Sequence, residues 1–394
     1  MRLADTRPPF AGLAKLPEEA LASLPTPCYL LDESQLRRNG EILLGVQQRT
    51  GCKILLAQKA FSNFDLYPLL APYLAGTEAS GLYESRLGKE ELPDKENHVF
   101  CAAFRADEFD ELLCCADHIV FNSPRQLKKF GPAAKAAGKS VGLRINPECS
   151  TQEGHAIYDP CAPGSRLGTT RAQWDAAAEK DPALLSLLDG LHFHTLCEQD
   201  ADALAATLDA VEARFGDLLP QMQWLNFGGG HHITRADYDI GLLEKCILHM
   251  KEKYDLDIYL EPGEAIALNA GYLATTVMDV VDNDIQTLIL DASAACHMPD
   301  VLEMPYRPPL RSSGMPEEKK YTYRLSSYTC LAGDIIGDYS FDEEKKVDDR
   351  LYFEDMAIYS MVKNNTFNGI PLPDIAVMDE SGECKVIRDR KSVV

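Results

Sequence analysis

The stretch from residue 191 to residue 230 reads LHFHTLCEQDADALAATLDAVEARFGDLLPQMQWLNFGGG and contains one strand–helix–strand unit. The apolar run LHFHTL (191–196) has the length of a buried strand. The amphipathic segment DADALAATLDAVEARFG follows it and predicts a helix that ends at Gly216. The run WLNFG (224–228) predicts a second strand, so we expect two parallel strands connected by a helix.

The same alternation recurs along most of the chain. Eight short apolar or β-branched runs are each followed by a helix-like stretch: KILLAQ (53–58), GTEAS (76–80), HVFCAA (98–103), HIVFNS (118–123), SVGLRIN (140–146), LHFHTL (191–196), WLNFG (224–228) and DIYLEP (257–262). Eight such units predict a closed (β/α)8 barrel. A doubly wound open sheet is the competing architecture, but no GxGxxG turn follows the first run, which argues against its dinucleotide-binding version.

After about Pro262 the pattern changes to strands separated by turn signals, in LATTVMDVVDN, IQTLILDAS, KKYTYRLSS, RLYFEDMA and DIAVMD. These strands predict an appended C-terminal β domain, which the early run TPCYLL (26–31) could join. The first barrel helix, SQLRRNGEILLGVQQ, is predicted to begin with Ser34 as its N-cap. We therefore expect a barrel over residues 32–265 and a β domain made of residues 1–31 plus 266–394.

The composition is that of a globular protein, with 45% apolar and 25% charged residues among 394. Lys and Arg number 39 and Asp and Glu 61, and the net charge of −22 argues against nucleic acid as a partner because phosphates would be repelled. No apolar run is long enough for a membrane span, and the opening MRLADTRPPFAGLAKL lacks an apolar leader core, so we expect a cytoplasmic protein without a membrane partner. Twelve cysteines without a CxxC pair predict reduced thiols.

Polar residues and glycines stand where the predicted barrel strands end, and in a β/α barrel the active site lies at these C-terminal ends. Lys59 follows the first run amid apolar neighbours, where an ammonium is costly, and a desolvated lysine can form a Schiff base. Gly228, Gly229 and Gly230 follow the seventh run and could cradle a phosphate with their backbone N–H groups. Glu261 ends the eighth run as a candidate buried carboxylate.

A metal site is the alternative interpretation of the same strand ends. His192 and His194 alternate with Phe193, so both imidazoles face the same side of their strand. Together with Glu261 they could bind zinc, and the protein would then be a metal-dependent barrel hydrolase.

Eight segments, in this order and spacing, resemble the fold-type III pyridoxal-phosphate-dependent decarboxylases, whose barrel is like that of alanine racemase. They are TPCYLL, LLAQKAFS, SRLGT, GLHFHTLCE, NFGGGHH, YLEPGEA, TCLAGD and NNTFNG. The resemblance runs from about Pro25 to Pro373. It is closest to the branch that decarboxylates carboxynorspermidine and carboxyspermidine to norspermidine and spermidine in polyamine biosynthesis.

The resemblance implies a role for each barrel residue. Lys59 would bind pyridoxal 5′-phosphate covalently, Glu261 would pair with the pyridine nitrogen, and His194 would stack on the ring. The three glycines would bind the phosphate, with the Tyr359 hydroxyl as a further partner.

The resemblance also implies that two residues reach the site from a second subunit. Cys330 would protonate the product carbon, and Asp334 would hold a distal ammonium of the substrate. A homodimer with shared active sites follows from these two roles.

One departure concerns the substrate. Related decarboxylases of ornithine, diaminopimelate or arginine carry Arg after the EPG motif, where this chain has Glu264. An anion there suits a substrate with additional ammonium groups, and Glu198 could assist. His297 also matches the polyamine branch and is a candidate substrate-binding residue. A diaminopimelate or other basic amino-acid decarboxylase remains an alternative, and so does a non-enzymic vitamin B6 carrier, although a carrier would suit a shorter chain without the β domain.

Overall fold

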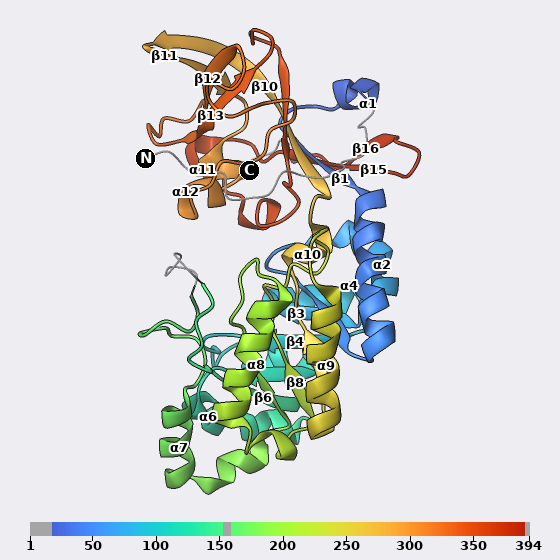
Figure 1. The fold of residues 1–394 in the computed structure, drawn as a ribbon. Coiled ribbons are helices and arrows are strands. Elements are labelled where there is room, and N and C mark those ends of the chain that lie inside the picture. The colour runs from blue at the N-terminus through green and yellow to red at the C-terminus, as the bar shows by residue number, and fades with distance from the viewer. Residues whose placement is uncertain (1–17, 153–158, 391–394) are drawn as a thin grey trace. The chain divides into compact units, whose positions relative to one another are not determined.

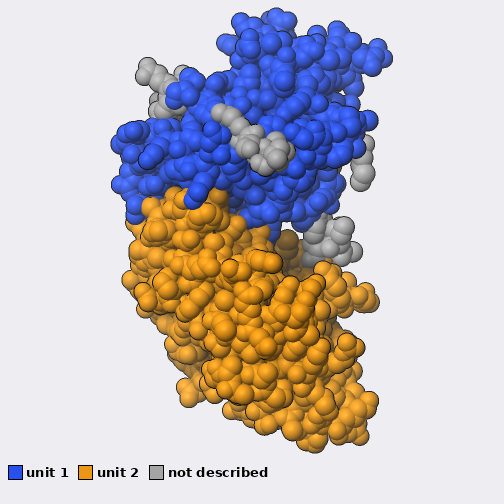
Figure 2. Space-filling view, turned by 180° about the vertical axis from the view of Figure 1, so that it is seen from behind, with its two compact units in different colours: residues 1–37, 267–394 blue, residues 38–266 orange. Residues whose placement is uncertain are grey.

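The computed structural model describes residues 18–152 and 159–390, and the chain divides into two compact units (Figure 2). The barrel unit comprises residues 38–266, and the sheet unit comprises residues 1–37 and 267–394. The expected lack of an apolar leader concerns residues 1–16, which lie outside the described residues. Within the described ranges, no helix has the length and apolar character needed to cross a membrane.

The barrel unit contains a closed barrel of eight parallel strands in sequence order, closed by pairing of its first and last strands (Figure 1). Each predicted run overlaps one strand, so the predicted fold class is confirmed. The strands are β2 (Lys53–Ala57), β3 (Gly76–Ala79), β4 (Glu96–Phe100), β5 (His118–Phe121), β6 (Ser140–Arg144), β7 (Gly190–His192), β8 (Trp224–Asn226) and β9 (Asp257–Leu260).

Helices connect successive barrel strands, as the 3.6-residue apolar period predicts. The α-helices are α2 (Glu33–Thr50), α3 (Tyr67–Leu70), α4 (Leu82–Glu91), α5 (Phe109–Cys115), α6 (Pro124–Ala136), α7 (Arg171–Lys180), α8 (Ala201–Phe215), α9 (Ile240–Tyr254) and α10 (Glu264–Ala267). Short 3-10 helices lie at Phe64–Leu66, Ala71–Tyr73, Pro182–Leu187 and Leu219–Gln221. The predicted N-cap at Ser34 is wrong, because α2 already begins at Glu33 and Asp32 Oδ1 accepts the Gln35 N–H at 3.2 Å.

Trp224 fills the inside of the barrel where two neighbouring strands carry glycine. A Cβ atom on Gly190 would lie 2.0 Å from the Trp224 ring, and one on Gly142 would lie 2.3 Å from it. The indole packs with Leu55, Phe100, Val120 and Tyr259 in one buried cluster. This packed interior leaves the strand ends as the place where polar groups can gather.

The sheet unit contains a mixed sheet with strand order β13-β12-β11-β10-β1-β15-β16, and β14 pairs with β10. TPCYLL joins this sheet as predicted, because β1 pairs antiparallel with β10 and parallel with β15. The strands are β1 (Cys28–Asp32), β10 (Gly271–Asn283), β11 (Ile285–Leu290), β12 (Tyr321–Ser327), β13 (Ile335–Phe341), β14 (Arg350–Glu354), β15 (Asp374–Met378) and β16 (Cys384–Arg388).

Short helices complete the sheet unit: α1 (Glu18–Ser23), α11 (Ala294–His297), α12 (Asp300–Glu303) and 3-10 turns at Met361–Lys363 and Phe367–Gly369. Helices α11 and α12 pack on a core that includes Tyr29, Leu288, Tyr339 and Phe353, whereas α1 packs on a second cluster with Leu30 and Tyr272. All twelve cysteines of the chain are thiols, as the sequence predicts.

Candidate functional site

Lys59 lies in the turn that follows β2, beside a buried carboxylate. Its Nζ is 3.6 Å from Glu78 Oε2 on the neighbouring strand β3. The lysine side chain is 34% exposed, whereas that of Glu78 is 1% exposed. The amine is thus reachable from solvent on one side and held by an acidic group on the other.

Glu78 is a site residue that the sequence reasoning missed. All four residues of β3 are buried, so the strand lacks the alternation that would have distinguished an inward-facing residue. A glutamate inside a buried strand is itself the available signal, because burial of an unpaired carboxylate is costly. Burial raises the pKa of Glu78, and the nearby Glu261 and Glu84 raise it further, against the opposing charge of Lys59. This carboxyl group is therefore suited to exchange a proton with the lysine amine.

Glu261 follows β9 and is held by two hydrogen bonds. Its Oε2 lies 3.0 Å from His192 Nε2, and its Oε1 accepts from Asn226 Nδ2 at 2.6 Å. Burial acts to raise the pKa of Glu261, but His192 and the positive charge of Lys59 lower it below its usual value. The barrel therefore contains two buried carboxyl groups whose pKa values are shifted in opposite directions. The shift favours the protonated form of Glu78 and the charged form of Glu261.

His192 supports Glu261 from the end of β7. Burial lowers the pKa of His192, so a neutral ring donates its Nε2–H to the carboxylate. The ring also stacks on Phe100, with centroids 5.6 Å apart.

The predicted zinc set of His192, His194 and Glu261 is not among the side-chain groups close enough to share a metal ion within the described residues. The two groups found are Glu96, His98 and His118, and Glu198, His232 and Glu264. The hydrolase interpretation therefore has no geometric support at the strand ends on which it was based.

His194 and the glycine loop lie against each other. The Gly229 N–H donates to His194 Nδ1 at 3.1 Å, and the Gly228 N–H donates to Asn226 Oδ1 at 2.9 Å. Burial is the main reason that the pKa of His194 lies well below its usual value, so the ring is neutral with its proton on Nε2. Two of the predicted phosphate donors are thus engaged within the protein, which leaves the Gly230 N–H as the one without an acceptor among the described residues.

Glycine is required in this loop by close backbone packing. A Cβ atom on Gly230, whose φ is +84°, would lie 2.0 Å from the Leu196 carbonyl oxygen. One on Gly229 would lie 2.5 Å from the Glu261 carbonyl oxygen. The loop after β8 is therefore pressed against the loops after β7 and β9.

Glu198, His232 and Glu264 come together at the ends of β7, β8 and β9. One ligand atom from each lies within 4.8 Å of the other two, and His232 Nε2 is 3.2 Å from Glu264 Oε2. We call these three residues the acidic cluster. The sequence predicted both glutamates as substrate-binding residues but did not identify the histidine between them.

Backbone contacts explain how the acidic cluster forms. The Gln199 N–H donates to the Gly230 carbonyl at 3.0 Å, and the His232 N–H donates to the Gln199 carbonyl at 3.2 Å. These bonds place Glu198 beside His232. The Thr234 hydroxyl donates to the Ala265 carbonyl at 2.6 Å, which ties the same loop to α10.

The acidic cluster is also linked to the turn that carries Lys59. A Cβ atom on Gly263, the residue before Glu264, would lie 2.5 Å from Ala60 Cβ. The Ala57 N–H donates to the Pro262 carbonyl at 3.3 Å. The loops that hold the lysine and the glutamate are therefore packed together.

Asp334 and His297, both in the sheet unit, belong to one buried hydrogen-bond network. Asp334 accepts from the hydroxyls of Ser293 at 2.6 Å, Ser327 at 2.5 Å and Thr329 at 2.6 Å. His297 Nδ1 accepts from the Ser293 N–H at 3.2 Å, and its Nε2 lies 3.2 Å from the Pro371 carbonyl. These bonds join α11 to the loops that carry Asp334 and Pro371 within the sheet unit.

Cys330 lies in an exposed loop of the sheet unit, where its N–H donates to Asn368 Oδ1 at 2.9 Å. Apolar side chains around it are also exposed, with Tyr328 at 40%, Leu331 at 43% and Phe367 at 45%. Tyr359 is partly buried and has a φ of +48°, which is rare for a tyrosine.

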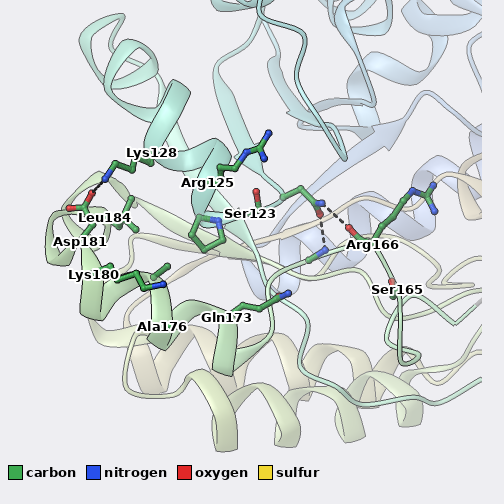
Figure 3. Close-up of a pocket in the computed structure, with 14 residues that line it drawn as sticks. Ser123, Arg125, Lys128, Ser165, Arg166, Gln173, Ala176, Lys180, Asp181 and Leu184 are labelled. Atoms are coloured by element: carbon green, nitrogen blue, oxygen red, sulfur yellow. Dashed lines mark hydrogen bonds and ion pairs between the residues drawn. The ribbon is translucent and has the colours of Figure 1, made fainter.

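A cavity of about 620 Å³ lies elsewhere on the barrel unit, next to α6 and α7 (Figure 3). Asn122 shapes it by donating to the Arg166 carbonyl at 2.8 Å and accepting from the Gly168 N–H at 2.7 Å. Lys128 and Asp181 pair across one end at 2.7 Å. None of the predicted site residues lines this cavity, so it is separate from the strand-end site.

Comparisons with known proteins show the family to which the chain belongs. A family model described as the pyridoxal-dependent decarboxylase, C-terminal sheet domain, matches residues 28–357. A carboxynorspermidine/carboxyspermidine decarboxylase of Campylobacter jejuni is 40% identical over 375 residues, which cover 92% of this chain and 96% of the relative. A carboxyaminopropylagmatine decarboxylase of Synechocystis sp. is 42% identical over 370 residues, with coverage of 93% and 94%.

A solved structure is similar over the same extent. The crystal structure of carboxynorspermidine decarboxylase from Campylobacter jejuni, complexed with norspermidine, has a TM-score of 0.86 and 39% identity, and the match covers 94% of this chain and 98% of that one. The family match and these relatives span nearly the whole chain, and the chain belongs to the family of pyridoxal-dependent decarboxylases.

Proposed function

We propose that this protein decarboxylates carboxynorspermidine and carboxyspermidine, releasing CO2 and norspermidine or spermidine. The observation that carries this proposal is the acidic cluster next to the turn of Lys59. The cluster places two carboxylates, Glu198 and Glu264, where the cationic tail of an amino acid held near the lysine could reach them. The whole-length similarity to decarboxylases of these substrates supports the same choice.

The barrel residues fit pyridoxal 5′-phosphate. Lys59 offers the amine, and Glu261 offers a buried carboxylate whose lowered pKa keeps it charged. Each carboxylate oxygen of Glu261 has a second lone pair beyond its bond to His192 or Asn226. Gly230 offers an N–H in a loop whose tight backbone turns admit no side chain. When bound, the cofactor would withdraw electrons from the substrate α-carbon as CO2 leaves.

The two carboxyl groups with shifted pKa values, Glu78 and Glu261, would hold or accept protons at the site. Glu261 would keep a proton on the ring nitrogen of the cofactor, because an ionised carboxylate stabilises the charged form of a neighbouring base. Glu78, 3.6 Å from Lys59 Nζ, would take up the proton that the amine must lose before it can form a bond to carbon. His194, neutral and hydrogen-bonded to Gly229, would present a flat ring surface at the same strand ends.

We also propose that the protein acts as a homodimer in which Cys330 of one protomer serves the site of the other. The exposed apolar residues around Cys330 suit a surface that a second copy covers. Mixing the variants Lys59→Ala and Cys330→Ala tests this arrangement. Random reassociation should restore about a quarter of the wild-type activity, because half of the dimers then carry one intact site. Sites built within one chain would stay inactive in the mixture.

Carboxyaminopropylagmatine is a second candidate substrate, favoured by the relative that is 42% identical. Its tail ends in a guanidinium instead of an ammonium. A guanidinium is planar and binds carboxylates with two parallel N–H groups, so two glutamates could also receive it.

Two measurements test the proposed function. Borohydride reduction followed by peptide mapping should place a pyridoxyl group on the peptide containing Lys59, and an unlabelled peptide would refute the cofactor assignment. Release of CO2 should be compared for carboxynorspermidine, carboxyspermidine, carboxyaminopropylagmatine, diaminopimelate and ornithine. Preference for either of the last two would overturn the proposed substrate class.

A further inference from the structure

His232 has no role in the proposed chemistry, yet it is buried between two carboxylates. Its exposed fraction is 7%, and neither of its ring nitrogens has a hydrogen-bond partner among the described residues. Its Nε2 lies 3.2 Å from Glu264 Oε2, and Glu198 completes the group. A buried imidazole with an unused nitrogen is costly, so its retention calls for a ligand.

The acidic cluster offers three acceptor atoms to a nitrogen cation. Three atoms that are at most 4.8 Å apart leave a point within about 2.8 Å of each, and this is the length of a charge-assisted N–H···O bond. An alkylammonium carries three donors, which matches two carboxylate oxygens and one ring nitrogen.

We infer that Glu198, His232 and Glu264 bind one ammonium group of the polyamine part of the substrate, and that this ammonium replaces a proton that His232 carries in the unliganded enzyme. This inference rests on the proposed function. It adds His232 as a binding residue and a proton that His232 releases when the ammonium binds. An imidazole nitrogen accepts a hydrogen bond only when it is unprotonated. The imidazolium proton therefore leaves to solvent as the ammonium binds, and the net charge of the cluster is unchanged.

The charges around His232 agree with this exchange. Burial lowers the pKa of His232, but Glu264 and Glu198 outweigh this effect and raise it above its usual value. Arg235, on the same loop, acts in the opposite direction, but it is paired with Asp200 at 3.2 Å and with Asp237 at 2.5 Å. In the unliganded protein the two glutamates thus favour the protonated form of His232, and a bound ammonium supplies the same positive charge.

Calorimetric titration of the pyridoxal-phosphate-loaded enzyme with norspermidine tests the exchange. Titrations in two buffers that differ in ionisation enthalpy, at about pH 6.5, measure the number of protons released. The wild type should release up to one proton, and its Kd should fall by up to about tenfold per unit of rising pH between about pH 6 and 7. The variant His232→Gln should show neither effect.

His249→Gln is the matched control, because His249 pairs with Glu212 at 3.2 Å on the barrel surface and should leave proton release unchanged. The visible spectrum and melting temperature of each variant verify the fold. Equal proton release from His232→Gln and wild type would overturn the inference, and so would zinc binding that depends on His232 while norspermidine binds without proton release. An enzyme that neither binds norspermidine nor decarboxylates its precursor would instead refute the proposed function.

Discussion

Each end of the barrel carries a cluster of carboxylate and histidine side chains. The cluster at one end includes a lysine, and the cluster at the other end has two carboxylates. At the N-terminal ends of the strands, Glu96 accepts from Lys53 Nζ at 2.6 Å and lies 3.1 Å from His98 Nε2. Lys53 also donates to the Tyr259 hydroxyl at 2.9 Å. At the C-terminal ends, the acidic cluster groups two carboxylates with one histidine.

This difference separates a structural cluster from a binding cluster. The N-terminal cluster contains its own cation, and removal of either partner would take a charged hydrogen bond from the other, so the cluster contributes to stability. The acidic cluster is completed only when a proton or a ligand arrives. Barrel enzymes bind ligands at the C-terminal ends of their strands, where the acidic cluster and Lys59 both lie.

The largest expected effect is on activity, from Lys59→Ala. Loss of the amine should reduce kcat by about a thousandfold or more and remove the visible absorbance of the bound cofactor. The melting temperature of the apoprotein should change little, because burial already raises the pKa of Glu78, and this carboxyl group can take up a proton once the lysine is gone. Lys53→Met, at the other end of the barrel, should keep the absorbance of the bound cofactor and have a lower melting temperature. Comparable activity in Lys59→Ala and wild type would contradict the assignment of catalysis to the C-terminal ends of the strands and of stability to the N-terminal ends.

Glu264→Gln should affect substrate binding more than turnover. Loss of one charge-assisted hydrogen bond costs about 1.5–3 kcal/mol, so KM for the polyamine substrate should rise about 10- to 100-fold with a small change in kcat. Glu244→Gln is a suitable control, since Glu244 pairs with Arg49 at 2.6 Å on the surface of the same unit. An unchanged KM in Glu264→Gln would remove Glu264 from the substrate site.

Features that are local in sequence were predictable. The eight strands and the placement of Lys59 and Glu261 follow from apolar runs and from the residues that end them. The grouping of Glu198, His232 and Glu264 was not predictable, because it depends on hydrogen bonds between three loops. His232 was hidden within the glycine motif NFGGGHH.

Tertiary contacts account for the other features that the sequence did not predict. Asp334 and His297 stand next to recognisable motifs, but motif position does not reveal that Ser293 bonds to both of them. Ser34 is a good capping residue in isolation, yet Asp32 supplies the side-chain acceptor two positions earlier. These contacts depend on tertiary packing, which no local pattern encodes.

Glu96→Gln should reduce stability and leave catalysis intact. Lys53 would lose its carboxylate partner, and a lost hydrogen bond to a charged group costs about 1–3 kcal/mol. The melting temperature should fall by a few degrees while kcat and KM for the polyamine substrate stay at wild-type values. Thermal melts and steady-state kinetics on the same preparation provide the check. A loss of activity at full stability would give the N-terminal cluster a functional role instead.

The smallest expected effect is the pH dependence of that stability difference. Burial acts to raise the pKa of Glu96, but hydrogen bonds from His98 and Lys53 lower it below its usual value. A carboxyl group whose pKa is depressed by folding stabilises the native state above its unfolded pKa of about 4.3, and this contribution is lost as the pH falls further. The gap in melting temperature between wild type and Glu96→Gln should therefore be constant from about pH 6 to 5 and narrow below about pH 4.3. A gap that persists unchanged at about pH 3.5 would mean that the charge of Glu96 is not what stabilises this end of the barrel.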